Sequence, residues 1–470
     1  MSSIIDAISN EDVSFLCSEL IQNNKVNPDD FSRYEVKRGL RNPDGTGVMA
    51  GLTHVCSVDG YYLSDGERVP REGRLTYRGI DIRDIVQNCV QEDRFGFEET
   101  AWLLMFGNLP TKQQLDQFCA LLARARELPE DFIEDMIMKS PSPNVMNKLA
   151  RSVLSLYSYD ANPEDLSVEN VVRQSIQILA QMPTIMSYAY QVKRRHYYHK
   201  SMYIHPVKPE CMTAETVLRT IRSHKEFSDE EAKLLDLCLI LHAEHGGGNN
   251  SAFATRVLTS SMTDTYAAIA AGIGSLKGFR HGGANLKVRE MLRFIENGVD
   301  DTENDGQVAD FLCRILRREA GDGSGLIYGM GHAVYTLSDP RAVILKENAR
   351  AFAEKNDFMR QFNLIERVER LTPEVFEKVK GTHKKVCANV DLYSGLIYEM
   401  LRIPDDLFTP LFCVARTAGW CAHRLEELMS GGRIIRPAYK SVALPRKYYP
   451  ISERKEGYIA RSYIPSEERV

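Results

Sequence analysis

The sequence lacks the features that would mark it for a membrane, a nucleic acid or secretion. No apolar run approaches the length of a transmembrane helix, and one of the longest covers only residues 266–274. The formal net charge of -5 over 470 residues gives no sign of a nucleic-acid surface, and the one basic cluster, residues 193–196, is short enough to be a solvated helix end. The amino terminus has no basic segment followed by an apolar core. We therefore expect a soluble, cytoplasmic protein.

Paired cysteines and the common nucleotide-binding motifs are missing too. None of the ten cysteines has the CxxC spacing of a zinc ribbon or a thioredoxin-like site. Most lie in apolar stretches, as Cys238 does, so we expect free thiols in a reducing compartment. The glycines of residues 272–278 have neither GxGxxG spacing nor a preceding strand, and no P-loop occurs. The sequence also contains no fixed-period repeat and no low-complexity linker.

What the sequence does contain is a set of glycine-rich segments that carry histidine or aspartate. They are LHAEHGGGNN at 241–250, GFRHGGAN at 278–285, GMGHAV at 329–334 and ANVDLYSG at 388–395. Glycine lets the backbone approach a ligand closely or adopt a positive φ, and imidazole donates or accepts a hydrogen bond near neutral pH. Four such segments in about a third of the chain predict a site assembled from several loops.

The hydrophobic pattern predicts a mainly α-helical chain with one small β region. Residues 51–58 and 74–78 alternate between apolar and polar, and Asp59-Gly60 and Asp65-Gly66 are turn signals, so we expect short strands or hairpins within about 46–85. Helical patterns dominate elsewhere. We expect helices within 1–38, at 97–106, at 113–126 behind a Thr111 cap, at 170–193 with a kink or break at Pro183, and at 228–241, 263–276, 284–297, 306–320, 340–355, 358–371, 372–381, 391–402 and 410–430.

His242 and His245 raise the question of a metal site. Their i, i+3 spacing on a helix end can bind a metal. The sequence HAEH, however, is neither HExxH nor HxxEH, and no third ligand stands nearby. The alternative is that one of the two histidines caps the helix, while the following glycines allow a ligand to approach the backbone.

The other candidate residues each have a structural alternative as well. His281 could be an ordinary turn residue, and Asp391 could be a helix N-cap or a general base. Arg341, beside a polar turn, suits binding of a carboxylate or phosphate but could form a surface ion pair. Arg416 lies in an apolar helix and needs an anionic partner there, and Arg436 lies in a turn.

Taken in order, these segments resemble the citrate synthase family. HAEH followed by GGGN and Ser, HGGAN, GMGHAVY with DPR, NVDLYSG, ARTAGW and RP all occur in the family's order, over roughly residues 46–440. Residues 73–79 and 106–111 also match. The resemblance implies a mainly α, citrate synthase-like two-domain helical fold with a small amino-terminal β-hairpin region. It implies a large domain of 1–285, a small domain of 286–391, and a return segment with a carboxy-terminal arm at 392–470.

The resemblance also implies a role for each candidate residue. His281 matches the donor to the thioester carbonyl of acetyl-CoA, Asp391 the base that removes the methyl proton, and His332 the residue that polarises the ketone of oxaloacetate. Binding of oxaloacetate or citrate is implied for His245, Arg341, Arg416 and, across a dimer interface, Arg436. Backbone contact with the CoA adenine is implied for Gly329, Met330 and Gly331.

The implied activity is that of an acyltransferase of the citrate (Si)-synthase type, which condenses acetyl-CoA with oxaloacetate and water to give citrate and CoA. No metal and no cofactor is implied, acetyl-CoA being a substrate, and the expected assembly is a homodimer or a higher oligomer. Two residues depart from the family's usual pattern: Arg280, which could lower the pKa of His281 or pair with a CoA phosphate, and Glu244, where aspartate is commoner. The alternatives are a 2-methylcitrate synthase using propionyl-CoA, a metal-dependent hydrolase built on His242 and His245, and a non-catalytic helical scaffold.

Overall fold

The computed structural model describes residues 9–23, 26–65, 67–381, 385–443 and 448–454. These residues form two compact units, one from the described parts of 1–49 and 436–470 and the other from the described parts of 50–435. The first unit contains α1 (Asn10–Asn23), α2 (Asp29–Arg33) and the short 3-10 helices η1 (Arg38–Leu40) and η5 (Ile451–Glu453). Within it, the Lys440 ammonium lies over the Tyr34 ring. The predicted domain boundaries at 286 and 391 fall inside the second unit and stay predictions.

The predicted β region is present as one small antiparallel sheet, of strand order β1-β2-β3, with β1 at Cys56–Ser64, β2 at Glu67–Tyr77 and β3 at Ile80–Asp81. Residues 51–55 lie outside the strands, contrary to the expected alternation. The predicted turn at Asp59-Gly60 is also wrong. Gly60 lies inside β1 at a register shift, where a Cβ would stand 2.8 Å from the Val334 carbonyl oxygen, so the glycine serves close packing rather than chain reversal.

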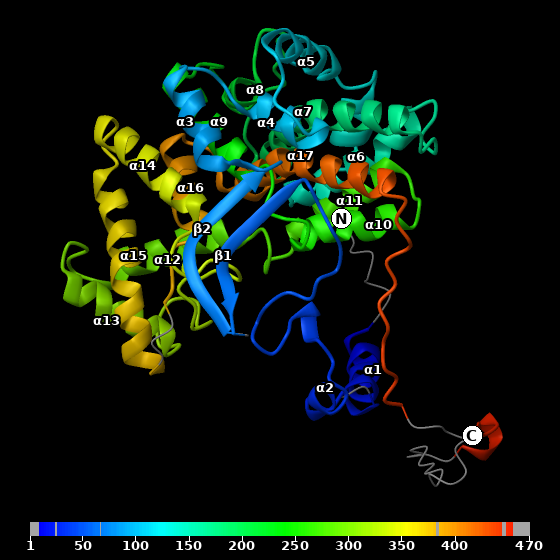
Figure 1. Cartoon of the computed structure of the whole chain (residues 1–470), viewed down its shortest axis with the longest axis vertical. Coiled ribbons are helices and arrows are strands. Elements are labelled where there is room, and N and C mark those ends of the chain that lie inside the picture. Colours follow the sequence, from blue (N-terminus) through cyan, green and yellow to red (C-terminus); the bar gives the residue numbers. More distant parts are fainter. Residues whose placement is uncertain (1–8, 24–25, 66, 382–384, 444–447, 455–470) are drawn as a thin grey trace. The chain divides into compact units, whose positions relative to one another are not determined.

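The second unit is otherwise helical (Figure 1). Its first helices are α3 (Ile82–Gln91), α4 (Phe97–Phe106), α5 (Lys112–Ala125), α6 (Val145–Leu156), α7 (Val168–Tyr198), α8 (Thr213–Ile221), α9 (Asp229–His242), α10 (Asn250–Ser260) and α11 (Thr265–Lys277). They are followed by α12 (Ala284–Gly298), α13 (Asp305–Leu316), α14 (Pro340–Lys355), α15 (Met359–Lys380), α16 (Val390–Met400) and α17 (Phe408–Met429). Short turns η2 (Ile133–Met138), η3 (Tyr157–Tyr159) and η4 (Asp405–Leu407) complete the list. None of the expected helix ranges covers α3, α6, α8 or α10.

Several predicted helix ends are confirmed at the level of the capping bonds. Thr111 caps α5 and Ser228 caps α9, each in a capping box with the residue three positions later. Gly107 ends α4 in the left-handed conformation, with φ of 92°. These ends are determined by side chains within one turn, which is why the sequence alone locates them.

Two prolines lie inside helices that continue past them, so the break allowed for at Pro183 is absent and the kink there stays a prediction. α7 continues through Pro183, and α15 continues through Pro373, so residues 358–371 and 372–381 form one helix instead of two. A proline in a helix interior costs about 3 kcal/mol. Met182, Ile185 and Met186 around Pro183 are fully buried, and α7 packs against α17 and α8. That burial offsets the lost hydrogen bond.

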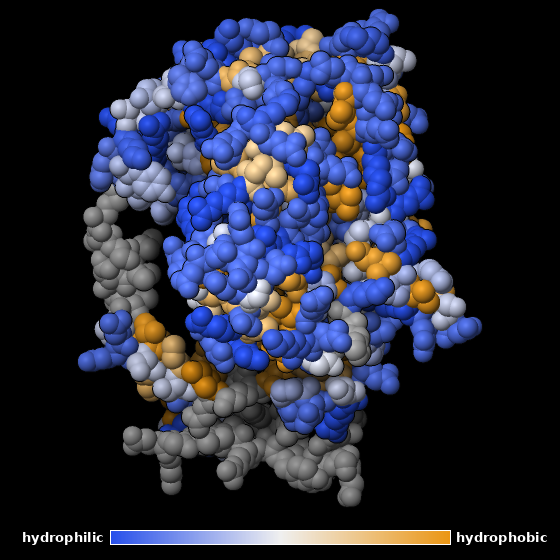
Figure 2. Space-filling view, turned by 90° about the vertical axis from the view of Figure 1, so that its left-hand side faces the viewer, coloured by the Kyte–Doolittle hydropathy of each residue, from blue (hydrophilic) through white to orange (hydrophobic). Residues whose placement is uncertain are grey.

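The packed helices divide into two hydrophobic clusters. The larger cluster runs through α4, α7, α9, α11, α16 and α17. The smaller one joins α12, α13 and α15, which lie on the left in Figure 1. Contacts of α12 with α16 and α17, and of α15 with α16, connect the two groups of helices. The face seen in Figure 2 is mostly hydrophilic. Ion pairs join α14 with α15, including Lys346 with Glu369 and Arg350 with Glu366. Within the described residues, no helix is both long and apolar enough to cross a bilayer.

Candidate active site

Two of the glycine-rich segments pair with each other through their backbones. The Gly331 N–H donates to the Cys387 carbonyl at 2.8 Å, and the Asn389 N–H donates to the Gly329 carbonyl at 2.9 Å, around a Met330–Ala388 bridge. Gly329 has φ of 80°, and a Cβ there would stand 2.8 Å from the Leu392 side chain. Only glycine allows this approach. The pairing brings the turn that carries His332 beside the start of α16, which carries Asp391.

The His332 ring is fixed by its own turn. Its Nδ1 accepts the backbone N–H groups of Val334 at 3.0 Å and Tyr335 at 3.1 Å. Because a backbone N–H can only donate, Nδ1 carries no hydrogen, and the neutral ring has its hydrogen on Nε2. The ring also stacks on Tyr335, with 4.6 Å between centroids. His332 is therefore built to present an Nε2–H donor.

His245 stands at the edge of His332. The two ring centroids are 5.1 Å apart at 90°, and Tyr335 is the next aromatic neighbour at 5.6 Å. The Nε2 atom of His245 is buried and has no hydrogen-bond partner among the described residues. Burial, and then the positive charges of Arg341 and Arg416, hold the pKa of His245 well below its usual value. The ring is neutral, with a polar atom available to a ligand.

Arg416 is a buried guanidinium on α17. Its Nε donates to the His242 carbonyl at 2.8 Å, and its carbon centre lies 4.7 Å from the centroid of the Phe412 ring. Both Nη atoms are buried without a hydrogen-bond partner among the described residues. Burial lowers the pKa of Arg416, while the Glu244 carboxylate opposes that shift. Leaving two cationic donors buried and unsatisfied is costly, so this arrangement favours an anionic ligand.

Arg341 is buried in the first turn of α14 and has a carboxylate partner. Its Nε and Nη2 donate to the two Asp339 oxygens at 3.1 and 2.7 Å, and Asp339 also caps the helix through the Arg341 N–H. Burial alone lowers the pKa of Arg341, but the Asp339 carboxylate raises it above the usual range. Arg341 is thus held in place and permanently charged. The electrostatic influence of Arg341 and Arg416 reaches both His245 and Asp391.

Asp391 is not the cap of its helix. That role belongs to Asn389, whose Oδ1 accepts the Asp391 backbone N–H at 3.0 Å. The Asp391 carboxylate is therefore not used in capping. Burial raises the pKa of Asp391 to about 6, with Asp339 adding to the rise and Arg341 and Arg416 opposing it. A carboxylate with a pKa close to neutral is suited to accept a proton.

His281 is fixed from a different helix. Its Nε2 lies 3.0 Å from the Ser251 hydroxyl and accepts the Ser251 backbone N–H at 3.3 Å, at the start of α10. That leaves Nδ1 to carry the hydrogen of the neutral ring. Burial, followed by the charge of Arg416, lowers the pKa of His281 to about 4. The expected influence of Arg280 on this pKa is wrong, because Arg280 is exposed and its carbon centre lies 5.6 Å from the centroid of the neighbouring Phe279 ring.

Glu244 is part of a buried polar network that the sequence analysis did not identify. Its Oε1 lies 3.0 Å from His423 Nε2, and His423 Nδ1 accepts a hydrogen bond from Arg256 Nε at 3.1 Å. Arg256 is in turn paired with Glu426 and Glu427. Burial favours the neutral acid, but the His423 ring and the Arg416 guanidinium lower the pKa of Glu244 to about 2. The signal in the sequence was the spacing of Arg416, Gly419 and His423, which puts all three on one face of α17.

The metal-site alternative finds no support in the geometry. The His242 ring is fully buried, packs 4.2 Å from the Phe412 ring, and has no hydrogen-bond partner for either nitrogen among the described residues. Its pKa is lowered well below the usual value, first by burial. His245 faces His332 and Tyr335 instead. In the part of the chain that the structure describes, no group of three or more histidine, cysteine or acidic residues is arranged to hold a metal ion.

The structure therefore groups most of the expected residues and leaves one aside. His245, His281, His332, Arg341, Arg416 and Asp391 influence one another electrostatically, and Gly329, Met330 and Gly331 carry the turn beside them. Arg436 is exposed and belongs to the first compact unit. The grouped residues offer two neutral ring donors, one carboxylate of raised pKa and two buried cations. Such a set can bind a dianion and remove a weakly acidic proton.

Comparison with known proteins agrees with this geometry. Residues 43–438 match the family model described as citrate synthase, C-terminal domain. The chain is 32% identical to citrate synthase of Haloferax volcanii over 86% of its own length and 94% of the relative. It is 31% identical to 2-methylcitrate synthase 1 of Corynebacterium glutamicum, over 87% and 98% of the two chains. The crystal structure of citrate synthase from Thermotoga maritima superposes with a TM-score of 0.69 at 30% identity, covering 90% and 100% of the two chains. The chain belongs to the citrate synthase family.

Proposed function

We propose that this protein is a citrate synthase that condenses acetyl-CoA with oxaloacetate and water to give citrate and CoA. The proposal rests on one group of residues. Neutral His245 and His332 lie together with Arg416, whose two Nη atoms have no hydrogen-bond partner among the described residues. Asp391, with a pKa raised to about 6, belongs to the same group. Each group is suited to one part of that reaction, and relatives of the same family carry the same name.

The first step is removal of a proton from the acetyl methyl group. A methyl group next to a thioester is a very weak acid, so a base and a donor to the developing enolate oxygen must act together. Asp391 takes the proton, and the Nδ1–H of His281 donates to the thioester oxygen. The ring of His281 stays neutral because its pKa is about 4, which makes it a donor rather than a competing acid.

The second step forms the carbon–carbon bond. The Nε2–H of His332 donates to the ketone oxygen of oxaloacetate, which makes the carbonyl carbon more electrophilic and stabilises the alkoxide that forms. Arg341 and Arg416 bind the two carboxylates, with His245 as a further contact. The two free Nη atoms of Arg416 match the bidentate geometry of a carboxylate.

The third step is hydrolysis of the citryl-CoA thioester by water, which releases citrate and CoA. Water must be excluded until the carbon–carbon bond exists, since early entry would hydrolyse acetyl-CoA instead. Closure of the small domain proposed for residues 286–391 over the large one is the device we propose for this exclusion.

Binding of CoA, assembly and location complete the proposal. Backbone of Gly329, Met330 and Gly331 contacts the CoA adenine, and Arg436 reaches the substrate of a partner subunit in a homodimer or a higher oligomer. The reaction requires no metal and no redox cofactor. Deprotonation, addition and hydrolysis together involve no net oxidation or reduction of the substrates. The protein acts in the cytoplasm.

The test is release of free thiol from acetyl-CoA in the presence and absence of oxaloacetate, with propionyl-CoA run in parallel. The proposal predicts oxaloacetate-dependent release with a larger kcat/KM for acetyl-CoA. Relatives include 2-methylcitrate synthases, so a larger kcat/KM for propionyl-CoA would reassign the acyl substrate. Release that does not depend on oxaloacetate would overturn the proposed condensation.

A further inference from the structure

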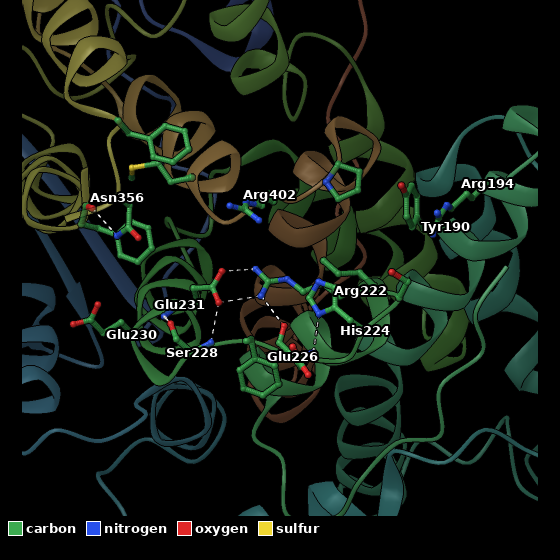
Figure 3. A pocket seen from close by; sticks show the side chains of 17 residues that line it. Tyr190, Arg194, Arg222, His224, Glu226, Ser228, Glu230, Glu231, Asn356 and Arg402 are labelled. Atoms are coloured by element: carbon green, nitrogen blue, oxygen red, sulfur yellow. Dashed lines mark hydrogen bonds and ion pairs between the residues drawn. The ribbon is translucent and has the colours of Figure 1, made fainter. Parts of the chain in front are cut away.

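A cavity of about 670 Å³ lies away from the candidate active site, inside the second compact unit (Figure 3). Its wall comes from the ends of α7, α8, α14 and α16, the start of α9 and the segment that follows α16. Aromatic and apolar side chains form much of the wall: Tyr190, Ile221, Phe227, Phe352, Phe358 and Met400. A space of this size and lining is typical of a site for a small organic molecule.

Half of the six charged groups of the wall already have ion-pair partners. Arg222 donates to both carboxylate oxygens of Glu231, at 3.0 and 2.6 Å, as Figure 3 shows. Glu230 pairs with Lys355 at 2.6 Å. These pairs hold the wall together and leave its net charge unchanged.

Two guanidiniums of the wall have no carboxylate partner among the described residues. Arg194 lies 5.2 Å from the Tyr203 ring, and Arg402 forms no ion pair with any described residue. Among the acidic residues of the wall, Glu226 alone forms no ion pair with a described residue. Arg402 is labelled near the centre of Figure 3, where its side chain extends among the wall residues. The wall's three arginines and three glutamates balance in number, so the positive charge without an ion-pair partner among the described residues is local to Arg194 and Arg402.

Arg402 is not explained as a cap of α16. The Leu401 carbonyl at that helix end already accepts a hydrogen bond from Arg222 Nη2 at 2.8 Å. Arg402 also adopts φ of 54°, a conformation that side chains other than glycine rarely take. His224 adds a neutral donor, because its Nδ1 accepts the Glu226 N–H at 3.1 Å and its hydrogen is then on Nε2.

We propose that this cavity binds an organic anion with a flat apolar part, its charged group on Arg402 and Arg194 and its apolar part against Phe227, Phe352 and Phe358. An aryl phosphate has the required chemistry. Inorganic phosphate lacks the apolar part, and an uncharged aryl alcohol lacks the charge, so each satisfies only half of the wall.

Three helices connect this cavity with the candidate active site. α9 begins in the cavity wall and ends at His242, α14 begins at Arg341 and ends in the wall, and α16 begins next to Asp391 and ends there. At 1.5 Å per residue these helices span about 16 to 24 Å. We extend the proposal, resting here on the proposed function, to regulation: the bound anion alters the KM for oxaloacetate through these helices.

The test of the site is calorimetric titration of the full chain with 1-naphthyl phosphate, 1-naphthol and inorganic phosphate. The proposal predicts saturable binding of 1-naphthyl phosphate and at least tenfold weaker binding of the other two. Arg402→Gln should raise the Kd at least tenfold. Arg318→Gln is the matched control, because Arg318 is an exposed arginine with φ of 65° outside this wall, and it should leave the Kd unchanged.

Three results would overturn the site: no saturable binding, an equal Kd for Arg402→Gln and Arg318→Gln, or loss of binding in Arg416→Gln but not in Arg402→Gln. The last result would place the probe in the candidate active site. The regulatory part is tested by the KM for oxaloacetate in the thiol-release assay, which 1-naphthyl phosphate should shift at least threefold in Arg318→Gln and not in Arg402→Gln. An unchanged KM in both would end the regulatory part. Since calorimetry needs no turnover, failure of the proposed reaction would not be mistaken for failure of the site.

Discussion

The turns that carry His281 and His332 fix their imidazole rings at opposite nitrogens. In the turn before α14, His332 Nδ1 accepts two backbone N–H groups from residues two and three positions later. In the turn before α12, His281 Nε2 accepts from Ser251, thirty residues earlier on α10. One ring is left with an Nε2–H and the other with an Nδ1–H.

The difference teaches that the same residue type is specified in two ways. The orientation of His332 is local, since four consecutive residues contain both the ring and its donors. The orientation of His281 depends on how α10 packs against the turn before α12. The Nε2–H of one ring and the Nδ1–H of the other can thus donate to carbonyl oxygens of two different substrates. Each donor can be removed separately by substitution.

Replacement of the proposed base, Asp391, has the largest expected effect on kcat. Without the base, neither histidine donor can promote the reaction. Asp391→Asn should lower kcat by about 10³-fold, because neither ring can replace the lost proton acceptor. Oxaloacetate affinity, measured by calorimetry, should change little, since Arg341 and Arg416 are untouched. A kcat within tenfold of the parent would remove Asp391 from the role of base.

Amide substitutions at His332 test which nitrogen donates. The amide nitrogen of glutamine occupies the position of Nε2, and that of asparagine the position of Nδ1. We expect kcat to fall about 10²-fold in His332→Asn, as for loss of a single donor to a developing oxyanion. In His332→Gln the fall in kcat should be about ten times smaller. His332→Asn should keep its melting temperature, because its carbonyl oxygen can still accept the Val334 N–H. The reverse order of activities would contradict the Nε2–H assignment.

The same pair of substitutions at His281 should give the opposite order. Asparagine places its N–H where Nδ1 stands, so His281→Asn should keep about tenfold more kcat than His281→Gln. Both are measured in the thiol-release assay at saturating oxaloacetate. Equal losses in both variants would show that the ring acts through its shape or packing instead of through a specific nitrogen.

The acid side of the pH profile separates the base from the rings. Asp391 has a pKa raised to about 6 and must be ionised to act, so kcat/KM should fall about tenfold per pH unit as the pH drops below 6. His281, with a pKa of about 4, stays neutral over most of that range. A profile that turns down only near pH 4 would assign the acid limb to His281.

Ser251→Ala has the smallest expected effect and tests the remote support of His281. The backbone N–H of residue 251 remains, so the losses are the hydroxyl contact with His281 at 3.0 Å and the hydroxyl's hydrogen bond to Asn249 Oδ1 at 2.9 Å. We expect kcat to fall about threefold to tenfold, as for a hydrogen bond worth about 1 kcal/mol, with the melting temperature nearly unchanged. An effect as large as that of His281→Gln would show that the backbone N–H does not hold the ring.

The sequence predicts best the features that depend on residues close together in the chain. The caps at Thr111 and Ser228 and the end of α4 at Gly107 each depend on residues within one turn, and the hairpin is located within its expected range. The resemblance of ordered motifs identifies the residues that the structure then groups, because those motifs lie in the loops that form the site. Asp391 was ambiguous from sequence, since Asn389 two residues earlier competes for the cap and only the geometry decides between them.

The sequence does not predict the features that depend on contacts between residues far apart in the chain. Pro183 predicts a kink or a break, yet α7 continues through it because its buried surroundings outweigh the local cost. Residues 358–371 and 372–381, predicted as two helices, form the single helix α15. The link from Arg256 through His423 to Glu244 joins residues far apart in the chain, and its one local sign is the spacing of Arg416, Gly419 and His423 on α17. Arg280 was expected to act on His281, but the charge that does so is Arg416, from a helix more than a hundred residues later.

The two unsatisfied nitrogen atoms of Arg416 have a consequence for the lifetime of the protein. A buried cation lacking hydrogen-bond acceptors weakens the folded state, and an anion that satisfies it restores that loss by mass action. Resistance to heat and to proteolysis should thus rise with the supply of the dicarboxylate. Abundance would then follow metabolic demand even where synthesis of the chain is constant.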